Sequence, residues 1–189
     1  MTLNVTDRYV FFWDGWPSQW HPSRFEVGGL PYNCCEQFMM AEKARVFGDV
    51  EAEERILASD SPRDQKAMGR NVRGFEQGRW NSVCRGIVYT GNLAKFSQNE
   101  GLRRKLMETG ERVIVEASPY DVIWGIGLGM EDPRVHDPSQ WRGSNWLGVD
   151  IMRVRATLAR RSRGTADELD DELTGQLLCR ERMRQEGGR

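Results

Sequence analysis

The sequence predicts a mainly α-helical protein, built as a single helical domain with two or three short β-strands. Two observations favour this fold class. Most of the first 160 residues divide into segments that begin at a good helix-capping residue and end at glycine or a polar turn. The stretches with strand character are only about four residues long, too short to build an extensive sheet.

Three short segments have the composition of strands. Residues 9–12 (YVFF) form the first, and residues 24–27 form the second, with a Gly-Gly turn after it. A tryptophan-rich loop at residues 13–22 separates them. Residues 113–116 (VIVE) form the third, and the Gly- and Pro-rich segment 121–145 that follows is expected to be irregular.

Six helices are expected from their capping residues and apolar spacing. Asn33 is a candidate N-cap with Glu36 at N3, an arrangement like a capping box. Asp49 caps the next helix, and Ser61 precedes a proline at the first helical position of the third. The expected helices cover residues 33–47, 49–58, 61–70, 79–96, 99–109 and 148–161. We therefore expect a domain over residues 1–160 and a charged tail, helical or disordered, over residues 161–189.

Composition excludes several classes of function. Lys+Arg is 27 against Asp+Glu 28, so no overall basic field attracts nucleic acid, and any such contact needs a local patch. No apolar run is long enough to span a membrane, and the first residues lack the pattern of a secretory leader. Four cysteines without a CxxC pair and two histidines predict a reduced, cytoplasmic protein without a metal site or other cofactor.

The helix expected at residues 33–47 carries the sharpest functional signal. Glu36 and Lys43 are seven residues apart, so they fall within about 20° of each other around the helix, in an arc of Met and Phe side chains. Apolar walls raise the pKa of a carboxyl and lower that of a lysine, which suits acid–base or Schiff-base chemistry. The structural alternative stays open: Glu36 completes the capping box, and Lys43 reaches solvent.

Further candidates lie outside this helix. Asp121 and Trp124 stand in the irregular segment, where Gly125 and Gly127 permit close approach of the backbone to a ligand. Asn145 is either a helix cap or a binding residue. Seven tryptophans, and only four lysines among the 27 basic residues, suit recognition of flat rings and phosphates, and they also suit an ordinary core with a salt-bridged surface.

Together these residues resemble the motifs of the YbiA-like, or NADAR (NAD and ADP-ribose), family. The resemblance starts with SQWHP at residues 18–22 and CCEQFMMAEKA at 34–44. It continues in order with MGR at 68–70, Trp80, KFSQN at 95–99, TG at 109–110, VEAS at 115–118, Asp121, WGIG at 124–127, NWLG at 145–148 and MRVR at 152–155. It covers about residues 9–158 and leaves out the tail.

The resemblance implies a mostly helical N-glycosidase that acts on ADP-ribosyl or ribosyl N-glycosides, with catalytic roles at Glu36, Lys43, Trp80 and Asp121. Substrate binding is expected at Gln19, Trp20, Arg70, Trp124, Gly125, Gly127, Asn145 and Arg153. The chain departs from the family pattern at Gln37, where a histidine is usual, and at Gln19, where an asparagine is usual.

Three functions follow from the resemblance. The first is an ADP-ribosyl glycohydrolase that removes ADP-ribose from guanine bases in DNA, as antitoxin to a DNA ADP-ribosyltransferase toxin. The second is an N-glycosidase of ribosylaminopyrimidine phosphates, intermediates of riboflavin biosynthesis. The third is a non-catalytic module that binds ADP-ribose or NAD.

Overall fold

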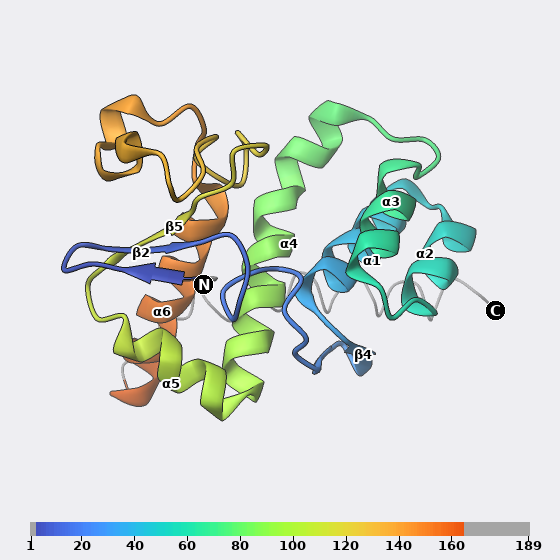
Figure 1. The fold of residues 1–189 in the computed structure, drawn as a ribbon. Helices are drawn as coiled ribbons and strands as arrows, with labels where there is room; N and C mark the ends of the chain where they lie inside the picture. Colours follow the sequence, from blue (N-terminus) through green and yellow to red (C-terminus); the bar gives the residue numbers. More distant parts are fainter. Residues whose placement is uncertain (1–2, 165–189) are drawn as a thin grey trace.

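The computed structural model describes residues 3–164, and Figure 1 shows how the elements of this part are arranged. Its strands are β1 (Leu3–Val5), β2 (Tyr9–Phe12), β3 (Phe25–Val27), β4 (Leu30–Tyr32) and β5 (Val113–Glu116). Its α-helices are α1 (Cys35–Phe47), α2 (Val50–Leu57), α3 (Pro62–Arg70), α4 (Gln77–Gln98), α5 (Glu100–Glu108) and α6 (Trp146–Ser162). The predicted mainly helical class is confirmed.

The long helix α4 is the central element of the fold. Figure 1 shows it running through the middle of the molecule, with α1, α2 and α3 on one side and β2, β5 and α6 on the other. Twelve of its residues are buried, because both sides of the molecule pack against it. It therefore joins the two halves through one hydrophobic core.

The main sheet has the strand order β1-β2-β5, with β1 antiparallel and β5 parallel to β2. All four residues of β2 are buried. Val10 and Phe12 belong to the main core, whereas Tyr9 and Phe11 pack with Val115 and the segment that follows β5 in a second, smaller core. Apolar residues on both faces explain why the sequence of β2 does not alternate.

The start of α1 differs from the expectation. Cys34, not Asn33, is the N-cap, and its sulfur accepts from the backbone N–H of Gln37. Gln37 then occupies N3 and accepts a hydrogen bond at 2.8 Å from the backbone N–H of Asn33. The capping role predicted for Glu36 thus falls to its neighbour, because the helix begins one residue later. This shift leaves the Glu36 carboxylate available for other contacts.

The other predicted helices are present, with ends within about two residues of the expectation. Asp49 and Ser61 cap α2 and α3 as predicted, by accepting from the backbone N–H groups of Ala52 and Asp64. The irregular segment contains two short 3-10 turns, η1 (Pro133–His136) and η2 (Pro138–Gln140). Of the predicted tail at residues 161–189, all beyond residue 164 lies outside the described residues.

Candidate active site

Two loops that leave neighbouring strands at the same edge of the sheet form the candidate site. β2 and β5 are parallel, with Phe12 in register with Glu116, so the chain leaves both strands at one edge. The loop after β2 carries Trp20, and the loop after β5 carries Asp121. The loop after β2 contacts the first turn of α1, because the backbone N–H of Glu36 donates to the carbonyl of Gln19 at 3.0 Å. From the loop after β5, the charge of Asp121 acts on the Glu36 carboxyl.

Glu36 is the centre of a group of side chains that we call the Glu36 cluster, with Trp20, Lys66, Arg70 and Asp121 around it. Its side chain is buried, and its Oε2 accepts a hydrogen bond at 3.2 Å from the indole Nε1 of Trp20. The ammonium of Lys66, on α3, lies 5.7 Å from the centre of the Trp20 ring. The indole therefore interacts with a carboxylate through its N–H and with a cation over its ring, and part of its surface is open to solvent.

Burial and the surrounding charges bring the pKa of the Glu36 carboxyl close to neutral pH. Burial raises the pKa of its carboxyl to about 6, and the negative charge of Asp121 adds to the rise. The positive charge of Lys66, the hydrogen bond from Trp20 and the charge of Arg70 oppose it. A carboxyl with such a pKa is mostly ionised at neutral pH and still accepts a proton readily, which suits a general base.

The two glutamines that depart from the family pattern have separate roles. Besides Asn33, the side chain of Gln37 binds the carbonyls of Ile56, Leu57 and Ser59 at the end of α2, so it anchors α1. Gln19 donates to the side chain of Asn92 on α4 at 3.3 Å. Its Oε1 is buried and has no hydrogen-bond partner among the described residues. Gln19 is therefore the more suitable of the two to accept a hydrogen bond from a ligand.

Asp121 organises the loop after β5. Its Oδ1 accepts hydrogen bonds from the backbone N–H groups of Ile123 and Trp124, at 2.9 and 2.7 Å. Gly125 packs against this turn so closely that a Cβ there would lie 2.8 Å from the carbonyl of Glu116. Gly127 has a φ of 68°, which favours glycine. In this structure the two glycines permit close packing within the loop, and their predicted approach to a ligand stays a prediction.

Lys43 lies in surroundings different from those of Glu36. Its ammonium is 4.2 Å from the centre of the Phe75 ring and 5.6 Å from that of Trp80, the buried aromatic of the first turns of α4. Burial lowers the pKa of this lysine, and the two rings stabilise its cationic form. The lysine whose charge acts on Glu36 is Lys66. A joint role of Glu36 and Lys43 in one cavity stays a prediction.

The remaining predicted binding residues divide between the cluster and α6. Arg70 is exposed at the end of α3 and acts electrostatically on Glu36. Trp124 is half-buried and packs edge-on against Trp146 at 5.8 Å. Arg153 pairs with the buried Asp150 at 3.2 Å, a carboxylate that it shares with Arg85. Its predicted role in phosphate binding is not supported by any contact with the Glu36 cluster in residues 3–164, and stays a prediction.

Asn145 makes no capping hydrogen bond, although it stands at the N-cap position of α6. Its side chain instead accepts from the backbone N–H of Glu116 at 3.0 Å and donates to the carbonyl of Ile114 at 2.9 Å. Gly148 permits this contact, since a Cβ there would lie 2.1 Å from the same Ile114 carbonyl. Asn145 thus fixes the end of β5, and its direct binding of a substrate stays a prediction.

Sequence reasoning missed two charged residues of the site, Lys66 and Glu116. Lys66 precedes Arg70 by one helical turn, so the spacing places both on one face of α3 and could have indicated the lysine. Glu116 is the last residue of the predicted strand. No sequence pattern shows that this strand pairs with β2 and ends beside Asp121 and Glu36.

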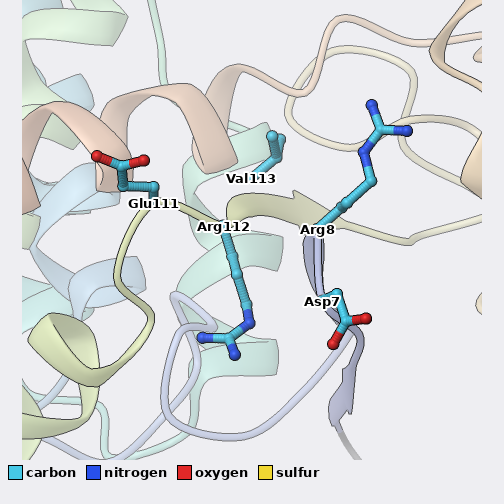
Figure 2. Close-up of a pocket in the computed structure, with 5 residues that line it drawn as sticks. All are labelled: Asp7, Arg8, Glu111, Arg112 and Val113. Carbon is cyan, nitrogen blue, oxygen red and sulfur yellow. The ribbon is translucent and has the colours of Figure 1, made fainter.

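Other site types receive little support from the described part of the chain. No group of three or more His, Cys, Asp or Glu side chains within residues 3–164 is arranged to hold a metal ion. In the same range no helix has the length and apolar character that a membrane span requires. Figure 2 shows a hollow at the opposite ends of β2 and β5, lined by Asp7, Arg8, Glu111, Arg112 and Val113. It is separated from the Glu36 cluster by the length of the two strands.

Comparison with known proteins agrees with this fold. The NADAR domain family matches residues 11–159. Relatives that carry the name N-glycosidase include R617 of Acanthamoeba polyphaga mimivirus, which is 40% identical over 79% of this chain and 96% of its own. The riboflavin biosynthesis protein VVA0006 of Vibrio vulnificus is 24% identical over 82% of this chain and 40% of its own.

A solved structure has the same fold. The NMR structure of Escherichia coli YbiA aligns with a TM-score of 0.70 and 25% identity, over 89% of this chain and 95% of YbiA. The class is thus a mainly helical protein with a buried carboxylate in a small cluster of charges. The chain belongs to the NADAR family, as a YbiA-like member.

Proposed function

We propose that this chain is an ADP-ribosyl glycohydrolase that removes ADP-ribose from guanine bases in DNA and counteracts a DNA ADP-ribosyltransferase toxin. The broader activity follows from the family: the chain is a hydrolase acting on N-glycosyl bonds, the activity named for its curated relatives. The observation that carries the proposal is the buried Glu36 carboxylate beneath an exposed indole, beside Lys66, Arg70 and Asp121.

The chemistry of an N-glycoside fits these residues. Cleavage of the bond between C1' and nitrogen builds positive charge on the ribose, which a carboxylate stabilises. Glu36 is placed to activate water, and Asp121 adds a second negative charge beside it. Lys43 has two candidate roles: it forms a Schiff base with the C1' aldehyde of a ring-opened ribose, or it binds phosphate.

Aromatic and cationic groups surround the carboxylates and suit a dinucleotide-like substrate. Trp20 is 39% exposed, so part of its indole is accessible to a base. Trp13 is also exposed and lies 6.1 Å from the ring of Tyr120, next to Asp121. Lys66 and Arg70 offer positive charge for a pyrophosphate. These features favour a large substrate with flat rings and phosphates.

A second candidate is an N-glycosidase of ribosylaminopyrimidine phosphates. The observation that favours it is the similarity to VVA0006, whose name places that protein in riboflavin biosynthesis. The same carboxylates and phosphate-binding cations serve this reaction. The substrate is smaller, so it requires fewer of the exposed aromatic residues.

Both candidates are tested by one set of assays. Wild-type protein is incubated with single-stranded DNA that carries ADP-ribosylated guanine and, in parallel, with a ribosylaminopyrimidine phosphate. Glu36→Gln and Lys43→Ala are each expected to reduce the rate by at least about 10²-fold, while thermal unfolding barely changes. Glu51→Gln and Lys105→Ala, at exposed positions on α2 and α5, are the matched controls.

The outcomes separate the three functions. Faster turnover of the modified DNA supports the glycohydrolase, and faster turnover of the small molecule supports the second candidate. Binding of ADP-ribose without turnover of either substrate would indicate a non-catalytic module. If both variants kept near-normal rates, the roles given to Glu36 and Lys43 would be wrong.

A further inference from the structure

Glu116 is held at the edge of the sheet from which both loops of the candidate site depart. It is the last residue of β5 and stands in register with the last residue of β2. Asn145 holds the strand end through two bonds at one edge, accepting from the backbone N–H of Glu116 and donating to the carbonyl of Ile114. Asn145 has a φ of 50°, the only positive φ of a non-glycine residue in the described part of the chain. A backbone held in this region indicates that surrounding contacts determine its position.

Charges on three elements act on the carboxyl group of Glu116. Asp121 on the loop after β5 and Glu36 on α1 are negative, and Lys66 on α3 is positive. Its Oε2 is excluded from solvent and has no hydrogen-bond partner within the described residues. An ionised carboxylate with a buried, unpartnered oxygen is costly, whereas the neutral acid is far less so.

We propose that Glu116 is the general acid of this site, the group that donates a proton to the departing base. This inference rests on the proposed N-glycoside hydrolysis. Burial, assisted by Asp121 and Glu36 and opposed by Lys66, raises the pKa of Glu116 to about 8. Glu36 titrates near 6. At neutral pH one carboxyl therefore holds a proton and the other is ionised, which is the division that an acid–base pair requires.

The proposed step needs only water and the two carboxyl groups. The bond between C1' and the base nitrogen breaks, and its electron pair goes to the nitrogen, which takes the proton of Glu116. A water oxygen forms the new bond to C1', and the water gives one proton to the Glu36 carboxylate. Transfer of that proton to Glu116, directly or through solvent, restores the starting state. No oxidant or further reactant is needed.

The test is the pH profile of kcat/KM for wild type, Glu116→Gln and the control Glu111→Gln, which changes an exposed carboxylate just before the same strand. Wild type is expected to lose activity above about pH 8, where Glu116 loses its proton. Glu116→Gln is expected to be at least about 10²-fold slower at pH 7 and to lack this alkaline limb. Circular dichroism shows whether the variant is folded, and Glu111→Gln should match wild type.

A second readout does not depend on turnover. Carbon-13 NMR of labelled glutamate carboxyls, with Glu116→Gln to assign the signal, should show Glu116 titrating well above the ordinary range of a glutamate. A normal pKa, or a folded Glu116→Gln with an intact rate and alkaline limb, would overturn the inference. In the latter case an inactive Glu36→Gln would leave the proposed function standing. Absence of turnover by wild type on both substrates would instead refute the proposed function, and this inference with it.

Discussion

Replacement of Glu116 by glutamine should stabilise the folded protein at neutral and alkaline pH. The folded-state pKa of about 8 lies above the ordinary value of 4.5. Between these two values the folded state binds more protons than the unfolded state, so the stability of wild type falls as pH rises. Glutamine resembles the protonated acid in shape and cannot ionise, so the variant escapes this loss.

The magnitude follows from linkage. Within this window the free energy of unfolding of wild type falls by about 1.4 kcal/mol for each pH unit, up to about 5 kcal/mol in total. Because Glu116 is half-buried, water and structural relaxation around the charge reduce this bound. We expect the variant to gain about 2 kcal/mol relative to wild type between pH 5 and pH 8.

Urea unfolding of wild type and Glu116→Gln, followed by tryptophan fluorescence at half-unit pH steps from 5 to 9, measures this difference. The gap between the two proteins should be smallest near pH 5 and should widen steadily toward pH 8. Glu111→Gln provides the control, with a gap that stays constant. A gap for Glu116→Gln that is independent of pH would show that Glu116 is already ionised at pH 5, and the electrostatic reasoning would then fail.

Four other perturbations test the site and its support. Trp20→Phe removes the hydrogen bond to Glu36, so the acid limb of the pH–rate profile should move above about pH 6; an unmoved limb would contradict the contact. Asn145→Ala leaves two buried backbone groups of β5 without partners and should lower the free energy of unfolding by about 2–4 kcal/mol in urea. Activity should survive EDTA; loss of turnover that a divalent ion restores would refute the metal-free assignment. Deletion of residues 165–189 should change Tm by less than about 4 °C, and a fall of more than about 10 °C would show that the tail packs on the domain.

Local sequence signals determined most of the helical fold. The N-caps at Asp49 and Ser61, the glycine after α1 and the proline at the start of α3 act within one or two turns, so they are visible in the sequence. The sequence also singled out Glu36, as a charged residue within an apolar arc, and its catalytic role stays a prediction. The burial of its side chain and its hydrogen bond to Trp20 agree with that interpretation.

Tertiary contacts decided which residue is the N-cap of α1. The sequence predicted Asn33 as the N-cap, whereas the structure has Cys34 there, and the side chain of Gln37 accounts for the difference. It binds carbonyl groups at the end of α2, which fixes it at N3 and leaves Glu36 outside the capping arrangement. Such a choice depends on a neighbouring helix, so no local pattern predicts it.

The place of Glu116 near the candidate site was decided by the tertiary structure alone. The sequence determined a short strand that ends at Glu116 and a glycine-rich segment that contains Asp121. It did not determine that this strand pairs in parallel with β2, a contact between distant parts of the chain. That pairing places Glu116 beside Asp121 and Glu36, where burial and like charges raise its pKa. The chemistry of a carboxyl group is set by the charges and solvent around it, and only the folded chain brings those together.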